Sequence, residues 1–132
     1  MAAAENRKLI ERFYALSNAG RIEEATELID ADIVWTNIGS TRFSGAFEGK
    51  QEVLEKLVGP LFGRLVDGIH CSIRNLIAEG DQVAAQIDGR ARTRDGRDYN
   101  NSYCNIYRIR DGKIVRIDEY MDTALVDAVF GN

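Results

Sequence analysis

The sequence has few of the residues that indicate metal or redox chemistry. Its 132 residues include two cysteines, one histidine and one proline. Because Cys71 and Cys104 do not have the spacing of a metal site, we expect two small buried hydrophobic side chains and neither a metal site nor a disulfide. His70 falls on the face of a predicted strand opposite Ile69 and Cys71, so we expect it at the surface or in a subunit contact.

Charge and hydropathy exclude further classes of protein. There are 17 basic and 21 acidic residues with the signs interspersed, and the net charge is −4, so we expect no nucleic-acid partner and no membrane surface as partner. No apolar run approaches the length of a membrane span. The N-terminal stretch MAAAENRKLIERF has charges from the start and no uninterrupted apolar core, which argues against a secretory signal and predicts a cytoplasmic protein.

The length and the apolar spacing predict one α+β domain covering residues 1–132. We expect helices at 5–18, 22–29, about 50–65 and 123–130, and strands at 32–38, 69–78, 82–93 and within 98–122. The stretch 39–49 is predicted to be a loop with little regular structure, and Pro60 to kink or split the third helix. Consecutive antiparallel strands that curl around helices make a cone, whose mouth can admit a ligand.

The last two strands form a hairpin around Asp111-Gly112, and its loop length decides which side chains share a face. A two-residue loop places Tyr103 opposite Tyr120. A three-residue loop, with Gly112 in the left-handed conformation, places Tyr103 opposite Glu119. A slip of one residue moves every side chain to the other face of the sheet.

Segregation of charge favours the three-residue loop. This loop leaves four charged residues together on the water-facing side: Arg108, Arg116, Asp118 and Asp122. It gathers on the other side Tyr99, Asn101, Tyr103, Asn105, Tyr107 and Ile109 with Val115, Ile117, Glu119 and Met121. The two-residue loop scatters the charges over both faces and turns Glu119 away from Tyr103, in which case a site built on these two residues does not exist.

In the three-residue register Glu119 is the only carboxylate that faces inward, and burial against apolar neighbours should raise its pKa. A raised pKa suits a general acid or base. The alternative is structural, with Glu119 satisfied by Tyr103 across the strands. Tyr103 is otherwise a donor to a developing oxyanion, and Asn101 and Asn105 can orient a carbonyl or hydroxyl.

Polar residues at alternate positions of a core-facing strand exceed what a core tolerates unpaired, so we expect a pocket here. Asn37 and Trp35 on the first strand would complete its wall, with Trp35 serving mainly as core packing. Tyr14 is turned about 100° from Phe13 on the first helix, which predicts a half-exposed packing role.

Several short motifs together resemble a known family. They are Asn18-Ala19-Gly20, Trp35, the loop 45–49, Ala78 to Val83, Arg110 to Ile114, and Glu119 to Asp122. Their order resembles the NTF2-like superfamily in its SnoaL-like or ketosteroid-isomerase-like branch, over nearly the whole chain. The resemblance implies a cone-shaped α+β fold, with a curved antiparallel sheet wrapped around three N-terminal helices, and a homodimer formed through the outer sheet face. It does not imply one reaction, because this fold hosts isomerases, hydrolases, cyclases, dehydratases and binding modules.

The catalytic positions of ketosteroid isomerases are mostly replaced in this chain. By resemblance, the tyrosine position falls on Phe13, the base near Thr36 or Asn37, and the protonated acid on Asn105. Only Asn105 retains a hydrogen-bond donor for its role, so steroid isomerase chemistry by that route is not expected.

The epoxide hydrolases of the superfamily are matched in part. Trp35-Thr36-Asn37 resembles their first-strand tyrosine and asparagine, and Glu119 matches their last-strand acid. The arginine–aspartate pair of their middle strand falls on Ile87 and Gly89, although a shift of one residue would bring Asp88 into the cavity.

The sequence therefore predicts a cofactor-free and metal-free small-molecule enzyme acting on a compact apolar ligand that bears a carbonyl or hydroxyl. Catalysis is assigned to Glu119, Tyr103 and Asn37, and substrate binding to Trp35, Asn101, Asn105 and Phe13. Isomerisation, dehydration and water addition fit these residues equally well. The alternative is a non-catalytic ligand-binding or dimerisation domain.

Overall fold

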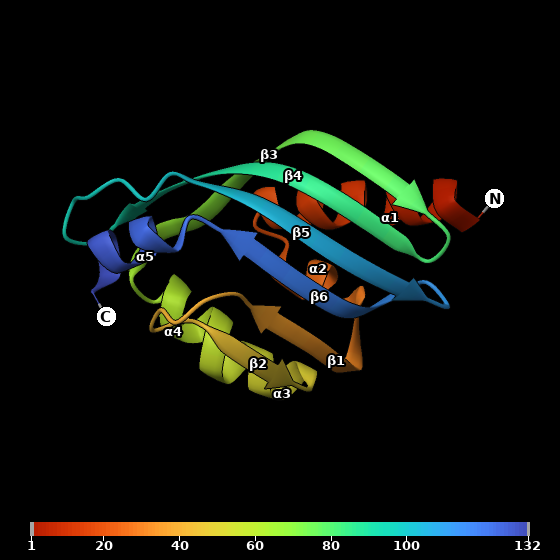
Figure 1. Cartoon of the computed structure of the whole chain (residues 1–132), viewed down its shortest axis with the longest axis horizontal. Coiled ribbons are helices and arrows are strands. Elements are labelled where there is room, and N and C mark those ends of the chain that lie inside the picture. The colour runs from red at the N-terminus through yellow and green to blue at the C-terminus, as the bar shows by residue number, and fades with distance from the viewer. Residues whose placement is uncertain (1, 132) are drawn as a thin grey trace.

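The computed structural model describes residues 2–131 and has the predicted α+β architecture, with helices along a curved sheet (Figure 1). The helical elements are α1 (Ala2–Asn18), α2 (Ile22–Glu27), α3 (Lys50–Glu52), the π-helix η1 (Val53–Val58), α4 (Gly59–Phe62) and α5 (Thr123–Phe130). The strands are β1 (Ile29–Asn37), β2 (Gly45–Glu48), β3 (Leu65–Glu79), β4 (Gln82–Thr93), β5 (Asn101–Arg110) and β6 (Lys113–Met121). Among residues 2–131, no helix is long and apolar enough to cross a membrane.

The strands form one sheet in the order β2-β1-β6-β5-β4-β3, in which β1 and β6 run parallel and the other neighbours antiparallel. Helix α1 packs against β3 and β4, and its buried residues Ile10 and Phe13 share a core cluster with Ile87 and Ile117 of the sheet. A second cluster lies at α5, where Phe130 packs with Leu57 and other apolar side chains. The sheet therefore wraps around the helices, as predicted.

The turn of the last hairpin has two residues, so the predicted three-residue loop is wrong. Asp111 and Gly112 both have positive φ, 51° and 73°. Arg110 pairs with Lys113, and Ile109 pairs with Ile114. Positive φ at both central positions is the type I′ turn, whose twist matches that of the flanking strands.

A β-bulge at Val115 nevertheless returns Glu119 to the predicted face. Pairing resumes with Arg108 opposite Arg116, so Val115 is the extra residue of β6. Ile114, fully buried, takes the core position predicted for Val115, which is only half-buried. Hydrophobic segregation correctly identified the buried face of the hairpin. It could not show whether the extra, unpaired residue lies in the turn or in a bulge within the strand.

The bulge also changes the cross-strand partner of Glu119. Asn105 lies opposite Glu119, and Tyr103 lies opposite Met121. The predicted Tyr103–Glu119 pair is therefore wrong, although both side chains remain on the same face of the sheet. The expected consequence of a two-residue loop, loss of the site, is also wrong because the bulge compensates for it.

Several element boundaries differ from the predictions, and three of the differences are large enough to describe. Part of the predicted loop at 39–49 forms β2, which pairs with β1 through Trp35 and Phe47. The second helix ends at Glu27, because Ile29 belongs to β1. The third helix ends at Phe62 and is not split: a π-helical turn, where an additional residue is accommodated, directly precedes Gly59 and Pro60.

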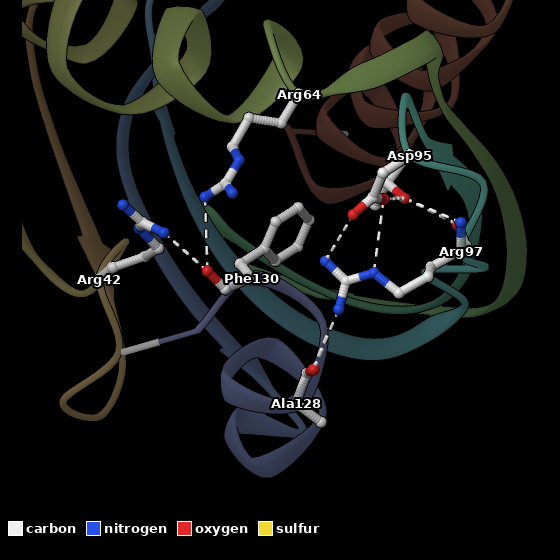
Figure 2. Close-up of polar contacts among 7 residues, drawn as sticks. Arg42, Arg64, Asp95, Arg97, Ala128 and Phe130 are labelled. Carbon is white, nitrogen blue, oxygen red and sulfur yellow. Dashed lines mark hydrogen bonds and ion pairs between the residues drawn. The ribbon is translucent and has the colours of Figure 1, made fainter.

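Helix α5 is held at its C-terminal end by arginines from three other segments (Figure 2). The carbonyl oxygen of Phe130 accepts hydrogen bonds from Arg42 at 2.6 Å and Arg64 at 3.4 Å, and that of Ala128 accepts one from Arg97 at 3.3 Å. Cationic donors satisfy carbonyl groups that the helix end leaves unpaired and interact favourably with the helix dipole. The position of Phe130 is therefore well defined.

Candidate active site

A cavity of about 580 Å³ lies between the helices and the inner face of the sheet. Its lining is mainly apolar and comes from α1, α2, η1, α4, α5 and the sheet. Six of the seven predicted site residues line it: Glu119, Tyr103, Asn37, Trp35, Asn105 and Phe13. The expected pocket is therefore present, and the cone interior is not filled by its aromatic side chains.

Three polar residues form a row across the inner face of the sheet. Glu119 of β6 pairs in register with Asn37 of the parallel strand β1 and with Asn105 of the antiparallel strand β5. Neighbouring strands lie about 4.8 Å apart, so the carboxylate is flanked by two amides within one side-chain length.

Glu119 has one hydrogen-bond partner in the described part of the chain. The indole Nε1 of Trp35 donates to Oε1 of Glu119 at 2.9 Å, whereas residues 2–131 offer Oε2 no hydrogen bond. Burial raises the pKa of Glu119 from its usual 4.5 to about 7, and the Trp35 hydrogen bond offsets part of this shift. The side chain is half-buried and lines the cavity, so it is accessible to a ligand.

The hydrogen bond to Glu119 comes from Trp35 and not, as predicted, from Tyr103. Trp35, predicted mainly as core packing, holds the carboxylate. Tyr103, the predicted partner of Glu119, donates instead to the hydroxyl of Tyr99 at 3.2 Å. The ring of Tyr103 lies over Gly89, where an added Cβ would be 2.8 Å from Cε2 of Tyr103. Any larger residue at position 89 would therefore displace Tyr103.

The two asparagines beside Glu119 each have one unsatisfied oxygen. Asn37 donates through Nδ2 to the carbonyl oxygen of Phe43 at 3.0 Å, and Asn105 donates to the hydroxyl of Tyr14 at 3.1 Å. The Oδ1 atoms of both asparagines are buried and have no hydrogen-bond partner within residues 2–131. In Asn37 the amide nitrogen is fixed by the carbonyl oxygen of Phe43; a buried acceptor left unpaired in this way costs about 1–3 kcal/mol, and such costs are concentrated at functional sites.

Tyr14 belongs to this site, although the sequence predicted a half-exposed packing role. It is 5% exposed, and its hydroxyl is hydrogen-bonded to that of Tyr107 and to Asn105. The prediction was wrong because Tyr14 packs edge-on against Tyr107 of β5, on the inner face of the sheet. The position of Tyr107 on the face of Asn105 was predictable, but its partner on a distant helix was not.

Asn101 does not line the cavity, so the structure gives no support to its predicted substrate-binding role. Its side chain bonds the backbone of Asp122 and Ser102 and the hydroxyl of Tyr99. It therefore connects the start of β5 to the end of β6. The alternation of side chains along a strand predicts on which face of the sheet a residue lies, but not whether that face borders the cavity at that residue.

The middle strand supplies no acid to the cavity. Asp88 is on the outer face, where it forms an ion pair with Arg74 at 3.2 Å and its side chain is 47% exposed. Ile87 lines the cavity and Gly89 is buried on the inner face. The arginine–aspartate pair of the epoxide hydrolases therefore has no counterpart here, and the one-residue shift that would have supplied Asp88 does not occur.

The remaining candidate residues do not form a reactive group. Cys71 lines the cavity, and burial raises the pKa of its thiol to about 11, which disfavours the nucleophilic thiolate. Cys104 is exposed on the outer face, contrary to the prediction of a buried side chain. His70 is exposed as predicted, at the edge of the cavity. Across residues 2–131, no three His, Cys, Asp or Glu side chains are arranged to hold a metal ion.

A curved sheet that encloses an apolar cavity, with the half-buried carboxylate of Glu119 in its wall, defines an α+β domain with a small-molecule pocket. The chain belongs to the SnoaL-like domain family, whose sequence model matches residues 10–117. A search of curated protein sequences found no significant match.

Several solved structures share the fold over nearly their whole length. Bal32a, from a soil-derived mobile gene cassette, is 22% identical with a TM-score of 0.85, over 97% of this chain and 98% of that one. An NTF2-like protein of unknown function from Burkholderia pseudomallei is 15% identical with a TM-score of 0.83, over 96% and 98%. TerC, co-crystallised with polyporic acid, is 21% identical with a TM-score of 0.82, over 96% and 98%. The fold is thus the NTF2-like fold.

Proposed function

We propose that this protein is a small-molecule enzyme that uses Glu119 as its general acid or base. Its substrate is a compact, largely apolar molecule with a carbonyl or hydroxyl group, and the reaction is an isomerisation, a dehydration or an addition of water. The proposed chemistry requires no metal or cofactor, because proton transfer needs only a positioned group whose pKa is near the working pH.

The observation that carries the proposal is the state of Glu119. A carboxyl group whose pKa is raised to about 7 exists in both protonation states near neutral pH, so it can take a proton and return it. Trp35 fixes one oxygen, and the other has no partner among residues 2–131. This second oxygen is not fully buried, and Glu119 lines the cavity, so a substrate can reach it.

The neighbouring polar groups have supporting roles in this proposal. Asn37 and Asn105 flank the carboxylate and orient the reacting carbonyl or hydroxyl. Tyr103 lies two residues further along the sheet, opposite Met121, and contributes its hydroxyl to the polar side of the cavity. Phe13 and Trp35 contribute apolar wall. A protein of the same fold, TerC, was co-crystallised with a small organic molecule, polyporic acid, which agrees with a ligand of this kind.

Proton exchange tests the proposal even while the substrate is unidentified. A library of compact ketones with exchangeable protons beside the carbonyl is incubated in D₂O, and NMR follows the loss of those proton signals. We expect catalysed exchange for at least one neutral ketone with the wild-type protein and only background exchange with Glu119→Gln. Asp118→Asn, which removes the outward-facing acid next to it, should exchange like the wild type.

The same experiment distinguishes the competing class of function. A non-catalytic binding domain would bind members of the library without exchanging their protons, and exchange that survives in Glu119→Gln would remove the assigned base. Either result contradicts the proposed mechanism.

We also propose that the protein acts in the cytoplasm as a homodimer formed through the outer sheet face. An apolar strip crosses three strands on this face, where Ile77 of β3 pairs with Ala84 of β4, and Ala84 pairs with Ile106 of β5. Ile77 is 62% exposed, which is unusual for a large apolar side chain among ion pairs.

Light scattering coupled to size-exclusion chromatography tests the dimer. We expect the mass of two chains for the wild type and of one chain for Ile77→Asp, because a charge opposite its own symmetry mate or inside an apolar contact disfavours association. Ile22→Asp, which makes the same substitution at an exposed apolar position of α2, away from the outer sheet face, is the matched control and should remain dimeric. A wild-type protein of monomer mass would contradict the proposed dimer.

A further inference from the structure

The orientation of the Asn101 side chain is determined by its backbone contacts. Its Oδ1 accepts hydrogen bonds from the backbone N–H groups of Asp122 at 3.1 Å and Ser102 at 2.8 Å. Only an oxygen can accept, so the other amide atom is the nitrogen, which donates to the carbonyl oxygen of Asp122 at 3.1 Å and to the hydroxyl of Tyr99 at 3.0 Å. Tyr99 is therefore an acceptor in this contact.

The hydroxyls of Tyr99 and Tyr103 retain one unused hydrogen between them. Tyr103 donates to Tyr99 at 3.2 Å, and Asn101 occupies a second lone-pair direction of Tyr99. Two hydroxyl groups have two hydrogens, and only one can lie between their oxygens. Whichever hydroxyl donates, residues 2–131 offer no acceptor for the other hydrogen within hydrogen-bond distance.

The two tyrosines that carry this unused donor line the cavity and have rigid supports. Tyr99 and Tyr103 both line the cavity, at 3% and 8% exposure. The ring of Tyr99 packs edge-on against Phe130 with centroids 4.8 Å apart, and the arginines at the end of α5 hold Phe130. Tyr103 lies over Gly89. A buried donor without a partner is costly, and a ligand oxygen would remove that cost.

The other pair of tyrosine hydroxyls in the cavity is different. Tyr14 and Tyr107 are hydrogen-bonded to each other and also have one hydrogen left over. Asn105 lies beside them with its Oδ1 unpartnered, and its amide is not fixed by backbone contacts. A rotation of that amide by half a turn brings the oxygen to the hydroxyls, so this pair can satisfy itself.

We propose that the hydroxyl pair Tyr99–Tyr103 is a second recognition point in the cavity, which binds an acceptor oxygen of the ligand such as a carbonyl, ester or ether oxygen. This inference rests on the proposed function in one respect, namely that the cavity is the substrate site. Tyr103 pairs with Met121, which lies two residues beyond Glu119 on β6, or about 7 Å along the strand. The substrate therefore has a reacting group at Glu119 and an acceptor oxygen toward α5.

Binding of two isosteric probes tests the inference. 2-Acetonaphthone has an acceptor oxygen where 2-isopropenylnaphthalene has a methylene group, and the two molecules otherwise have nearly the same shape. Titrations are made at about pH 9, where Glu119 is ionised and cannot donate. We expect the ketone to bind the wild-type protein about ten-fold more tightly than the hydrocarbon, the effect of one hydrogen bond.

Variants of the pair should show a characteristic non-additivity. Tyr99→Phe and Tyr103→Phe each leave one hydroxyl with a free hydrogen, so each should keep most of the preference for the ketone. The double variant Tyr99→Phe/Tyr103→Phe has no donor and should bind the two probes within about two-fold. The matched control, Tyr14→Phe/Tyr107→Phe, removes the same two atoms elsewhere in the cavity and should retain the preference.

A preference that survives in the Tyr99/Tyr103 double variant, equal affinities in the wild type, or failure of both probes to bind would each overturn the inference. If the double variant does not fold, infrared spectra of the bound ketone replace it. The carbonyl band should then differ between Tyr99→Phe and Tyr103→Phe, because the donor differs, and an unchanged band overturns the inference. Glu119→Gln should keep the preference, so loss of the proposed catalysis and loss of this recognition point are separate results.

Discussion

Replacement of Glu119 by glutamine should lower kcat/KM by about 10²–10⁴-fold on any substrate that the protein turns over, the usual contribution of a general acid or base. Glutamine has nearly the same shape, and its amide oxygen can accept the hydrogen bond from Trp35 that Oε1 accepts now. The change therefore removes the titrating proton and little else. Steady-state kinetics of the purified variants measure the effect.

Two matched variants make this result specific. Asp118→Asn removes an acid from the adjacent, outward-facing position and should leave kcat/KM within about two-fold, as is usual for surface substitutions. Glu119→Asp retains the acid but withdraws it by one methylene, so its activity should lie between the wild type and Glu119→Gln. Equal activity of wild type and Glu119→Gln would contradict the assignment.

The pH dependence of kcat/KM then identifies the direction of proton transfer. If Glu119 acts as a base, the rate should fall ten-fold per pH unit below about pH 7 and reach a plateau above it, because only the carboxylate accepts a proton. If Glu119 acts as an acid, the rate should reach a plateau below about pH 7 and fall ten-fold per pH unit above it, because only the protonated carboxyl group can donate a proton. A profile without a limb near pH 7 contradicts both assignments.

Glu119 should also make the wild-type protein less stable as the pH rises through the range from about 4.5 to 7. Burial raises the pKa of this carboxyl group in the folded state to about 7, against 4.5 for an ordinary glutamate. Within that range the folded protein retains a proton that the unfolded chain has lost, so the unfolded state binds fewer protons and the free energy of unfolding decreases with pH. A difference of about 2.5 pKa units corresponds to roughly 3 kcal/mol.

Urea unfolding at several pH values between 4 and 9 measures this effect as a difference between two proteins. The free energy of unfolding of Glu119→Gln minus that of the wild type should increase by roughly 3 kcal/mol from about pH 4 to about pH 8, because only the wild type has the buried acid. Asp118→Asn should follow the wild type. Parallel curves for wild type and Glu119→Gln would show that the carboxyl group is not destabilised by burial. This measurement does not depend on a substrate.

The effects on activity and on stability have one physical cause. The desolvation that makes Glu119 a usable acid or base at neutral pH is the same effect that costs stability when it ionises. Glu119→Gln is thus expected to be an inactive protein that is more stable at high pH. A purely structural acid with the same burial would show the same effect on stability, so the loss of kcat/KM is the result that distinguishes the two roles.

The sequence alone was sufficient for the class of fold and for the inward orientation of Glu119. Apolar periodicity located the helices and every strand except β2, and the charged positions of the last hairpin identified its buried face correctly. Glu119 was therefore recognised as the inward carboxylate, and its raised pKa followed from its apolar neighbours. These properties depend on local alternation, which a sequence records directly.

Tertiary structure decided the pairing register of the last hairpin and the hydrogen-bond partners of the cavity residues. Asp111-Gly112 is compatible with either loop length, and only the packed sheet placed the extra residue at Val115. The contacts of Glu119 with Trp35, and of Tyr103 with Tyr99, join side chains whose relative positions depend on the bulge and on the curvature of the sheet. Alternation thus determined that the hairpin at 98–122 carries the acid of the cavity. The fold determined which groups hold that acid and which hydroxyls remain free for a ligand, because these depend on the distance between strands and helices remote in sequence.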